Sequence, residues 1–383
     1  MRLLRVHSPL LSRLLLLCLL SALPLVLNAC GGHTFSGQMR FFTIPPPYLA
    51  TGSIATGPDG NIWFPTVAYE HFGTTQPSGA IGRITADGKL SMFALPNPNS
   101  YPQSIVAGPD GTLWFTAVQG SGKVEYGVDT PPGFQQSVSE IGYLTITGKF
   151  TLLNPLPSGT YAGEIVNGPD DHLWFTEAMY SGSPGNSETN QLARVTSSAS
   201  GGAIRTFSLP LLQQDDIVTS LVTGPDGNLW FGISGVVMPG YNEFGKIGRM
   251  TPQGALQVFA LGKFIEDRNL VTGPDKNLWF TCSSGVGRIT VDGKLHLFTP
   301  PDLQAGYGYN AGGIVADSDG GLWYVGGSAG INRVSTDGAF TAYPIPAGPN
   351  ADETYRRRLD RGITVASDGT LWFIAVNEIG HMV

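Results

Sequence analysis

A short pattern of turn residues followed by apolar residues recurs along the chain. In its first copy, the turn Gly57–Gly60 (GPDG) precedes an apolar segment that contains Trp63 and Phe64. Proline sets φ at the second position of such a turn, and Asp-Gly closes it. A short apolar run bounded by turn residues is typical of a β-strand. All tryptophans of the chain stand in this pattern: Trp63, Trp114, Trp174, Trp230, Trp279, Trp323 and Trp372.

Each copy is long enough for four short strands. In the first copy we expect strands at residues 53–56, 62–64, 81–85 and 89–95, with Asp87-Gly88 forming the hairpin turn between the last two. Four antiparallel strands in a repeat of roughly fifty residues are typical of a propeller blade. The sequence therefore predicts an all-β fold with one seven-bladed β-propeller over residues 38–383.

The two ends of this region complement each other. The last repeat stops at Glu378–Val383, which corresponds only to a third strand. The missing fourth strand is found at the other end, where Gln38–Pro45 matches Lys89–Pro96 of the first repeat. We therefore expect the N-terminal strand to complete the last blade and close the ring, which removes the open sheet edges.

The recurrent aromatic and charged residues are interpreted as structural. We expect the tryptophans to pack between neighbouring blades, because burying one such ring removes roughly 150–250 Å² from water. A sugar-binding aromatic ladder is the alternative, but a binding site rarely needs so many equivalent copies. A third-strand arginine recurs, and an aspartate of each turn is a plausible partner. The arginines are Arg83, Arg194, Arg249, Arg288 and Arg333, and His381 takes this place in the last repeat.

The N-terminus is typical of a targeting segment rather than of the fold. Three arginines precede an apolar run over 14–27, which is too short for a permanent bilayer span. The run ends in Leu27-Asn28-Ala29-Cys30, which resembles a bacterial lipobox. We expect 1–29 to be a lipoprotein signal peptide, Cys30 to carry lipid and 30–37 to be a tether, so that the protein is anchored in the cell envelope. A plain secretory signal is the alternative.

Composition narrows the classes of partner. The formal net charge is −7, and the charged fraction is only 13%. The one basic run is Arg356–Arg358, so we do not expect nucleic acid to be a partner. With Cys30 carrying lipid, Cys282 has no cysteine to pair with in the mature chain, and we expect it to be a small buried apolar residue. A ring closed on itself is expected to be a monomer.

Long insertions gather on one end of the predicted ring. We call this end the loop-rich face; it carries the connections that follow second and fourth strands. The long loops are expected at 65–80, 116–140, 176–191 and 232–246, and charged crossings at 262–268 and 347–361. Variable loops on a rigid scaffold usually carry binding sites. The expected ligand-binding residues are Arg268, Tyr355, Arg357 and Asp360.

The repeated phrases GPDG-x-LWFT and IGRIT-x-DGKL resemble the streptogramin B lyase (virginiamycin B lyase) family, over residues 38–383. The resemblance implies a β-propeller that opens a cyclic depsipeptide lactone by elimination. It also implies a general-base histidine, a glutamate and Mg²⁺ at the mouth of the central channel. In that family the histidine stands eleven residues before the blade tryptophan, and the glutamate stands three residues after it.

This chain departs from that pattern. The positions eleven before each tryptophan are Gly52, Gln103, Gly163, Thr219, Arg268, Gly312 and Arg361, and none is histidine. Of the positions three after, only Glu177 is a glutamate. Abstraction of a proton from carbon needs a base poised near neutrality. Of the histidines elsewhere in the chain, His71, in the first long loop, is the one placed to reach the loop-rich face.

These observations leave three functions open. The leading hypothesis is a non-catalytic module that binds a small molecule, peptide or protein on the loop-rich face. The second is a lyase of the resembled type in which Arg361, Arg268 or Glu177 replaces the missing groups. The third is a lactonase-like hydrolase that uses one divalent metal. Hard oxygen ligands suit Mg²⁺ or Ca²⁺, and Glu177, Glu266 and Asp267 are the candidate ligands for either ion.

Overall fold

The computed structural model describes residues 37–68, 79–97, 100–119, 138–180, 187–195, 202–212, 216–235, 244–263, 267–302, 312–326, 330–346, 359–375 and 377–383. The regular elements in these ranges are β-strands. No helix that could cross a membrane occurs in this part of the chain.

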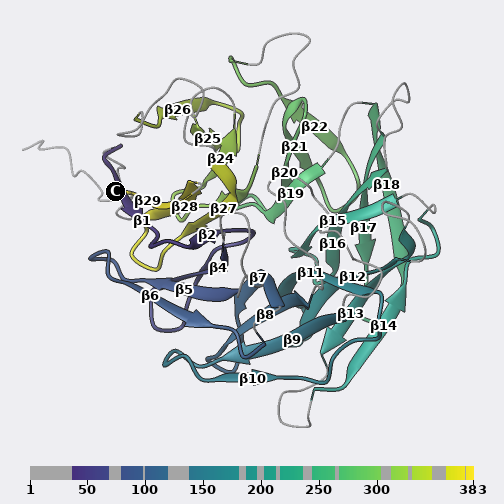
Figure 1. Cartoon of the computed structure of the whole chain (residues 1–383). Coiled ribbons are helices and arrows are strands. Elements are labelled where there is room, and N and C mark those ends of the chain that lie inside the picture. Colours follow the sequence, from purple (N-terminus) through teal and green to yellow (C-terminus); the bar gives the residue numbers. More distant parts are fainter. Residues whose placement is uncertain are drawn as a thin grey trace, which may run out of the picture. The chain divides into compact units, whose positions relative to one another are not determined.

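The strands form seven antiparallel sheets that follow one another around a ring (Figure 1). Blade 1 comprises β2 (Tyr48–Ala50), β3 (Ala55–Thr56), β4 (Ile62–Ala68), β5 (Ala80–Ile84) and β6 (Leu90–Ala94). Blade 2 comprises β7 (Ser100–Ala107), β8 (Leu113–Gln119), β9 (Val138–Leu144) and β10 (Phe150–Leu152). Blade 3 comprises β11 (Thr160–Asn167), β12 (Leu173–Tyr180), β13 (Ser187–Val195) and β14 (Ile204–Ser208). Blades 4 and 5 comprise β15 (Asp216–Thr223), β16 (Leu229–Gly235), β17 (Phe244–Met250) and β18 (Leu256–Lys263); and β19 (Asp267–Thr272), β20 (Leu278–Cys282), β21 (Gly285–Ile289) and β22 (Leu295–Phe298). Blades 6 and 7 comprise β23 (Ile314–Ala316), β24 (Gly321–Gly326), β25 (Gly330–Ser335) and β26 (Phe340–Pro344); and β27 (Leu359–Val365), β28 (Leu371–Ala375), β29 (Glu378–Met382) and β1 (Met39–Thr43). The predicted all-β, seven-bladed propeller is confirmed.

The N-terminal strand closes the ring, as the sequence predicts. Strand β1 pairs antiparallel with β29, from Met39 opposite Met382 to Thr43 opposite Glu378. In Figure 1 the purple β1 lies beside the yellow β29. We call this pair of strands the closing seam. Blade 7 is therefore built from the two ends of the propeller.

Each tryptophan is buried against the next blade. All of them are at most 1% exposed. Trp63 of blade 1 packs with Phe115 of blade 2, and Trp372 of blade 7 packs with Phe64 of blade 1. A fourth-strand ring covers the other side of most of these indoles; Phe93, for example, stacks on Trp63 at 5.4 Å. Such full burial supports the core interpretation and leaves no exposed aromatic surface for a sugar.

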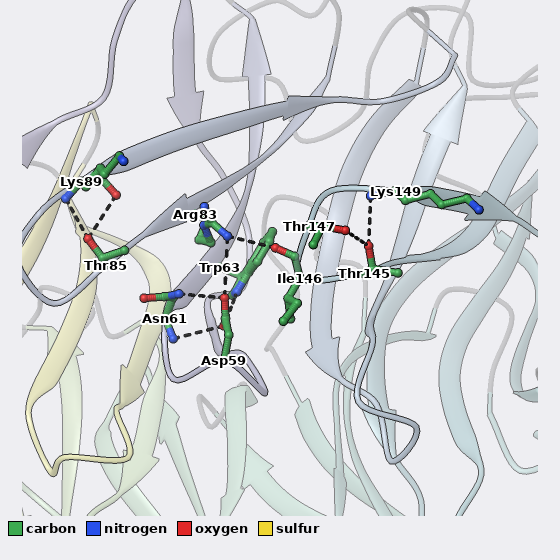
Figure 2. A network of polar contacts seen from close by, with 10 residues as sticks. All are labelled: Asp59, Asn61, Trp63, Arg83, Thr85, Lys89, Thr145, Ile146, Thr147 and Lys149. Atoms are coloured by element: carbon green, nitrogen blue, oxygen red, sulfur yellow. Dashed lines mark hydrogen bonds and ion pairs between the residues drawn. The ribbon is translucent and has the colours of Figure 1, made fainter.

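The third-strand arginines join the turn, the tryptophan and the next blade. Figure 2 shows Arg83 between Asp59, whose Oδ2 lies 3.9 Å from Nη1, and the carbonyl of Ile146 in blade 2, which accepts from Nη1 at 2.9 Å. The guanidinium also lies 5.4 Å from the Trp63 ring, whose Nε1 donates to Asp59. The expected aspartate pairing therefore exists. The other pairs are Arg194–Asp170, Arg249–Asp226, Arg288–Asp275 and Arg333–Asp317.

Two features require glycine in the hairpin turns: a positive φ, and the close approach of an aromatic ring from the neighbouring blade. Gly88 has a φ of 91°, and a Cβ built there would lie 2.1 Å from the Phe42 ring of β1. Gly148 meets Phe93 in the same way, at 2.2 Å. The Asp-Gly turn thus lets the fourth-strand ring of one blade lie directly against the hairpin of the next.

The second and third strands extend further than the sequence pattern predicts. In blade 3, β12 continues to Tyr180 and β13 begins at Ser187, within the segment 176–191 that was expected to be loop. The strands of blades 1, 2 and 4 likewise enter 65–80, 116–140 and 232–246, and β18, β19 and β27 enter the charged crossings. Those loop boundaries were wrong, because ladder pairing continues past the Trp-Phe core, where the alternation of apolar residues stops.

Candidate functional site

The first strands of most blades are irregular at one repeated position. In blade 2, the register shifts between Pro102 and Ser104, which leaves Gln103 as the bulged residue. Equivalent shifts occur in β11, β15, β19 and β27. In blade 1 the two short strands β2 and β3 are separated at this place. A bulge bends a strand and re-aims one side chain, and bulges are frequent beside functional sites.

The bulged positions coincide with the places where the resembled lyases carry their histidine. First strands of neighbouring blades contact one another, so these positions surround the axis of the propeller. We call them the bulge ring. Its members are Gly52, Gln103, Gly163, Thr219, Arg268, Gly312 and Arg361.

Close packing explains two of the glycines in the bulge ring. A Cβ on Gly52 would lie 2.2 Å from the carbonyl oxygen of Gln103, and one on Gly163 would lie 2.5 Å from Thr176 Oγ1. Between blades 2 and 3, the Tyr161 hydroxyl donates to Gln103 Oε1 at 3.0 Å. Blades 1 to 3 therefore offer glycine and neutral amide and phenol groups at this ring.

Hydrogen bonds between blades hold the first strands just below the bulge ring. The side chain at the next position accepts a backbone N–H from the following blade. Ser53 Oγ accepts from Ile105 N at 2.9 Å, and Glu164 Oε2 accepts from Leu221 N at 3.1 Å. Glu164 therefore has a structural role, although it is an acidic residue close to the channel. These bonds keep the rim of the site rigid.

Glu177 is a buried ionisable group of blade 3. It lies on β12, opposite Ala162 and Gln191, and is 5% exposed. Its Oε2 has no hydrogen-bond partner among the described residues. Burial raises the pKa of the Glu177 carboxyl above its usual 4.5. A carboxyl in this environment holds a proton more readily than an exposed one.

The register places Glu177 between blades 2 and 3. Ala162, its cross-strand neighbour, belongs to the core cluster that also contains Trp114 and Phe175. Thr160, two residues before Ala162, is fully buried, and its Oγ1 also has no partner in the described part of the chain. Sequence reasoning missed Thr160, because a threonine on a strand carries no signal of function.

A second buried polar group joins blades 3 and 4. Lys246 Nζ lies 2.7 Å and 3.0 Å from the two carboxylate oxygens of Asp216, which is 3% exposed. The Asn190 side-chain amide donates to the backbone carbonyl of Asp216. This pair was not predictable from the sequence, because its members stand in different strands and neither belongs to the repeated phrase.

The remaining predicted site residues are placed only in part. Tyr355, Arg357, His71, Glu266 and Cys30 lie outside the described residues. The backbones of Asp267 and Arg268 begin β19, and those of Asp360 and Arg361 lie in β27. Roles for these residues therefore stay predictions.

The described residues do not make a divalent-cation site on their own. No three His, Cys, Asp or Glu side chains gather anywhere in the described ranges. Glu177 supplies one carboxyl there, whereas Mg²⁺ and Ca²⁺ take about six or more oxygen ligands. The described side chains therefore do not by themselves form the Mg²⁺ site that the resemblance implies.

Cys282 behaves as predicted. It is fully buried in the cluster that contains Trp230 and Phe280, and it forms no disulfide. Two further histidines, His172 and His296, lie elsewhere in the fold. His172 Nδ1 lies 2.7 Å from the backbone carbonyl of Asp170 in a first-to-second-strand turn, and His296 lies on the outer strand β22.

Comparison with known proteins agrees with the architecture. Residues 26–129 match the Virginiamycin B lyase family. The virginiamycin B lyase of Bordetella parapertussis is 34% identical over 71 residues, which are 18% of this chain and 21% of that protein. The lyase of Bordetella bronchiseptica matches equally. The aligned part thus spans about a fifth of the length of these curated relatives.

Solved structures match over nearly the whole chain. A streptogramin B lyase structure superposes with a TM-score of 0.63 at 23% identity and covers 90% of this chain and 97% of its own. Virginiamycin B lyase from Staphylococcus aureus gives 0.64 at 23% identity, with 90% and 99% covered. YCF48 bound to the D1 peptide gives 0.55 at 13% identity, with 90% and 95% covered. Together, these findings show a seven-bladed β-propeller whose fold is similar to that of the virginiamycin B lyases.

Proposed function

We propose that this protein is a binding module that recognises a ligand at the bulge ring on the loop-rich face, without turning it over. The observation that carries this proposal is the composition of the ring. None of its seven members is histidine, although the bulged backbone that would aim a side chain there is retained. The scaffold for a ligand is therefore present, while the general base that the resemblance implies is missing.

The chemistry of the ring favours a ligand with an anionic group on one side. Arg268 of blade 5 and Arg361 of blade 7 hold equivalent bulge positions, and Gly312 of blade 6 stands between them. Arginine is well suited to binding carboxylates in a bidentate manner, and a glycine leaves room for the ligand itself. Asp360, Tyr355 and Arg357 belong to the same segment as Arg361, so we propose them as further contacts.

The other side of the ring favours neutral or donor groups. Gln103 and Tyr161 are joined by a hydrogen bond across blades 2 and 3, and buried Glu177 lies at that same blade boundary. A peptide or a small molecule with both a carboxylate and N–H groups fits this distribution. YCF48, which shares the fold at low identity, is solved with a bound peptide.

A lyase or hydrolase is the second candidate, and one observation favours it. Glu177 keeps the position of the glutamate in the resembled phrase, and its buried carboxyl has a raised pKa. A carboxyl whose pKa is raised by burial holds its proton more readily and can serve as a general acid. A catalytically inactive virginiamycin B lyase variant from Staphylococcus aureus, 23% identical to this chain, is solved with quinupristin. If this chain is an enzyme, a cyclic depsipeptide lactone is the substrate class to test first.

We further propose that the propeller is displayed outside the cytoplasm and held to a membrane through lipid on Cys30. The support is the sequence pattern of the first thirty residues alone. Lipid attachment would place the loop-rich face within reach of envelope or external ligands. Metabolic labelling with a fatty-acid analogue, compared between the natural chain and Cys30→Ala, tests this part; unchanged labelling contradicts it.

The function is tested with quinupristin as the probe. Purified residues 31–383 are incubated with and without Mg²⁺, and products are followed by liquid chromatography and fragmentation mass spectrometry. Hydrolysis adds one water to the lactone, whereas elimination leaves the mass unchanged but shifts the retention time and fragments. A binding module leaves the lactone intact in every condition. Ring opening that disappears in Glu177→Gln would overturn the proposal in favour of the enzyme.

Binding is measured separately from turnover. Calorimetry with acetylated di- and tripeptides that carry a free carboxylate, and with their amidated counterparts, tests for an anionic group. We expect the carboxylate forms to bind more tightly, by roughly tenfold, and Arg268→Gln to remove that difference. Arg205→Gln, on the outer strand β14, is the matched control for loss of one positive charge. Equal affinity for both peptide forms would contradict the assigned ligand chemistry.

A further inference from the structure

One position of the repeat differs chemically in the blade that closes the ring. The third-strand residue that lies over the tryptophan is arginine in five blades and Tyr143 in blade 2. In blade 7 it is His381, on β29, directly opposite Arg40 of β1. Arginine stays charged and tyrosine stays neutral across ordinary pH, so histidine alone among these side chains changes charge between about pH 5 and 8.

His381 is part of a stack that spans the closing seam. Its ring lies on Trp372 of β28 with centroids 4.0 Å apart and planes 12° apart. Phe42 of β1 stacks on the same indole at 6.0 Å and 18°. Phe42 also lies against Gly88 in the hairpin of blade 1. The imidazole is therefore packed among the strands that join the two ends of the propeller.

The imidazole is buried without hydrogen bonds. His381 is 6% exposed, and neither Nδ1 nor Nε2 has a partner among the described residues. The arginines at this position reach further; Arg288, for example, donates to the carbonyl of Thr336 in the next blade at 3.0 Å. A histidine is too short to make that bond, so the boundary between blades 7 and 1 lacks this link. A protonated ring would bury two N–H donors and a charge without partners.

The charged groups around His381 do not cancel this cost. Burial lowers the pKa of His381 below its usual 6.5; Asp368, in the turn before β28, acts to raise it, and Arg40 of β1 acts to lower it. In the facing hairpin of blade 1, Asp87 accepts from Thr85, and the Lys89 backbone N–H also bonds to Thr85. Because the unfolded chain binds the proton more tightly, the contribution of His381 to stability is complete above pH 6.5 and is lost as the pH falls through the lower folded value.

We propose that His381 makes the closing seam acid-sensitive, so that protonation releases strand β1 from β29 and opens the propeller between blades 7 and 1. The opening is local, because the other blade boundaries do not depend on a histidine at this position. Release frees the N-terminal strand while the remaining blades stay folded. This behaviour would let the protein respond to acidification of its surroundings.

The test uses trypsin cleavage after Arg40, which requires β1 to leave the seam. Cleavage is measured in the mature protein at pH 7.5, 6.5 and 5.5 and normalised to an unstructured peptide with the same residues around Arg40. We expect the normalised rate to rise by up to about tenfold for each unit that the pH falls between 6.5 and the lower folded pKa, and to level off below that folded value. Far-UV circular dichroism at each pH shows whether the other blades remain folded.

Two test substitutions of His381 introduce the residues found at the equivalent position of other blades. His381→Tyr copies blade 2 and His381→Arg copies the majority of blades, so both have precedent at this position. We expect both to make Arg40 cleavage nearly independent of pH, and His296→Tyr, on the outer strand β22, to leave the acid response unchanged. An equal acid response in His381→Tyr and in the natural protein would overturn the proposal.

A cross-linked seam separates local opening from global unfolding. Thr43 and Glu378 face each other at one end of the seam. The pair Thr43→Cys and Glu378→Cys, oxidised to a disulfide, is expected to suppress Arg40 cleavage at acidic pH, and reduction is expected to restore it. Acid cleavage that persists at full rate in the oxidised form would show that the seam is not the point of opening, and would also overturn the proposal.

Discussion

At the scale of single residues, most blades share a contact between a turn carboxylate and the third-strand arginine, even where the residue that supplies the carboxylate changes. Asp170 shows this most fully, because it accepts from Trp174 Nε1 at 2.8 Å and from Arg194 Nη1 at 2.7 Å. In blade 6, Asp319 is the residue equivalent to Asp170, but the arginine pairs with Asp317 instead. Asp317 stands two residues earlier in the turn. The requirement is thus a carboxylate within reach of the guanidinium.

Removing such a carboxylate should be costly. In Asp170→Ala, a buried indole N–H and a half-buried guanidinium lose their acceptor, so we expect a loss of about 2–3 kcal/mol in the free energy of unfolding. Urea unfolding measures the change. Asp292→Ala, in an exposed hairpin turn, is the control and should alter stability by less than about 0.5 kcal/mol. Equal effects of the two substitutions would refute this view of Asp170.

Whereas the carboxylate of Asp170 stabilises the fold, ionisation of Glu177 should destabilise it. Burial raises its pKa, so the folded state resists ionisation of this carboxyl. Its stabilising contribution is present below the usual 4.5 and is lost as the pH rises through the folded value. We therefore expect Glu177→Gln to be more stable than the natural protein at pH 8, by roughly 1 kcal/mol, and equal to it near pH 4. Thermal unfolding at both pH values decides; a pH-independent difference would contradict the assignment.

At the scale of elements, the sequence predicts strand identity well and strand ends poorly. The turn Gly57–Gly60, the apolar run around Trp63 and the match of β1 to a fourth strand were all readable, because local turn chemistry and periodicity determine them. The extension of β12 to Tyr180 was not, because cross-strand pairing rather than alternation sustains it. The bulge at Gln103 was also invisible, since register is a property of two strands together. The burial of Glu177 without a partner depends on the neighbouring blade and is likewise not encoded locally.

The seam strand should tolerate transfer to the other end of the chain. In blade 1, Ile84 pairs with Leu90, and the five residues Thr85–Lys89 form the turn between them. In the seam, Met382 pairs with Met39. A linker Ala-Asp-Gly inserted between Val383 and Gln38 therefore gives a turn of the same length. We expect a circular permutant that starts at Pro46 and ends with this turn and residues 38–45 to fold with the same circular dichroism spectrum. Its melting temperature should equal or exceed that of the natural order. Failure to fold would mean that β1 depends on the segment before it.

At the scale of the whole molecule, the blades share their cores with their neighbours. Each tryptophan of one blade belongs to the cluster of the next, so no blade has a complete core of its own. The architecture was predictable because its signal is repeated. The ligand was not, because the proposed contact residues, such as Arg268 and Arg361, are not part of the repeated phrase. Loss of one blade should therefore propagate to those beside it.

The thiol of Cys282 reports on this coupling. It is fully buried in the cluster shared by blades 4 and 5. In a protein without Cys30, we expect a thiol reagent to react with Cys282 only as the fold is lost, with a urea midpoint that matches circular dichroism. Ser283→Cys, in the adjacent β-turn, is the control that should react in the folded state. Reaction of Cys282 well before the spectroscopic transition would indicate that blade 5 opens independently.

The closing seam also has a consequence for biosynthesis. Strand β1 leaves the ribosome first, yet its partner β29 is the last strand to be made. Until the final residues emerge, the nascent chain carries an unpaired β1 and an incomplete seventh blade. Closure of the ring therefore comes only after β29 has been synthesised. A chain truncated within β29 would present two open sheet edges, which makes it prone to aggregation and proteolysis.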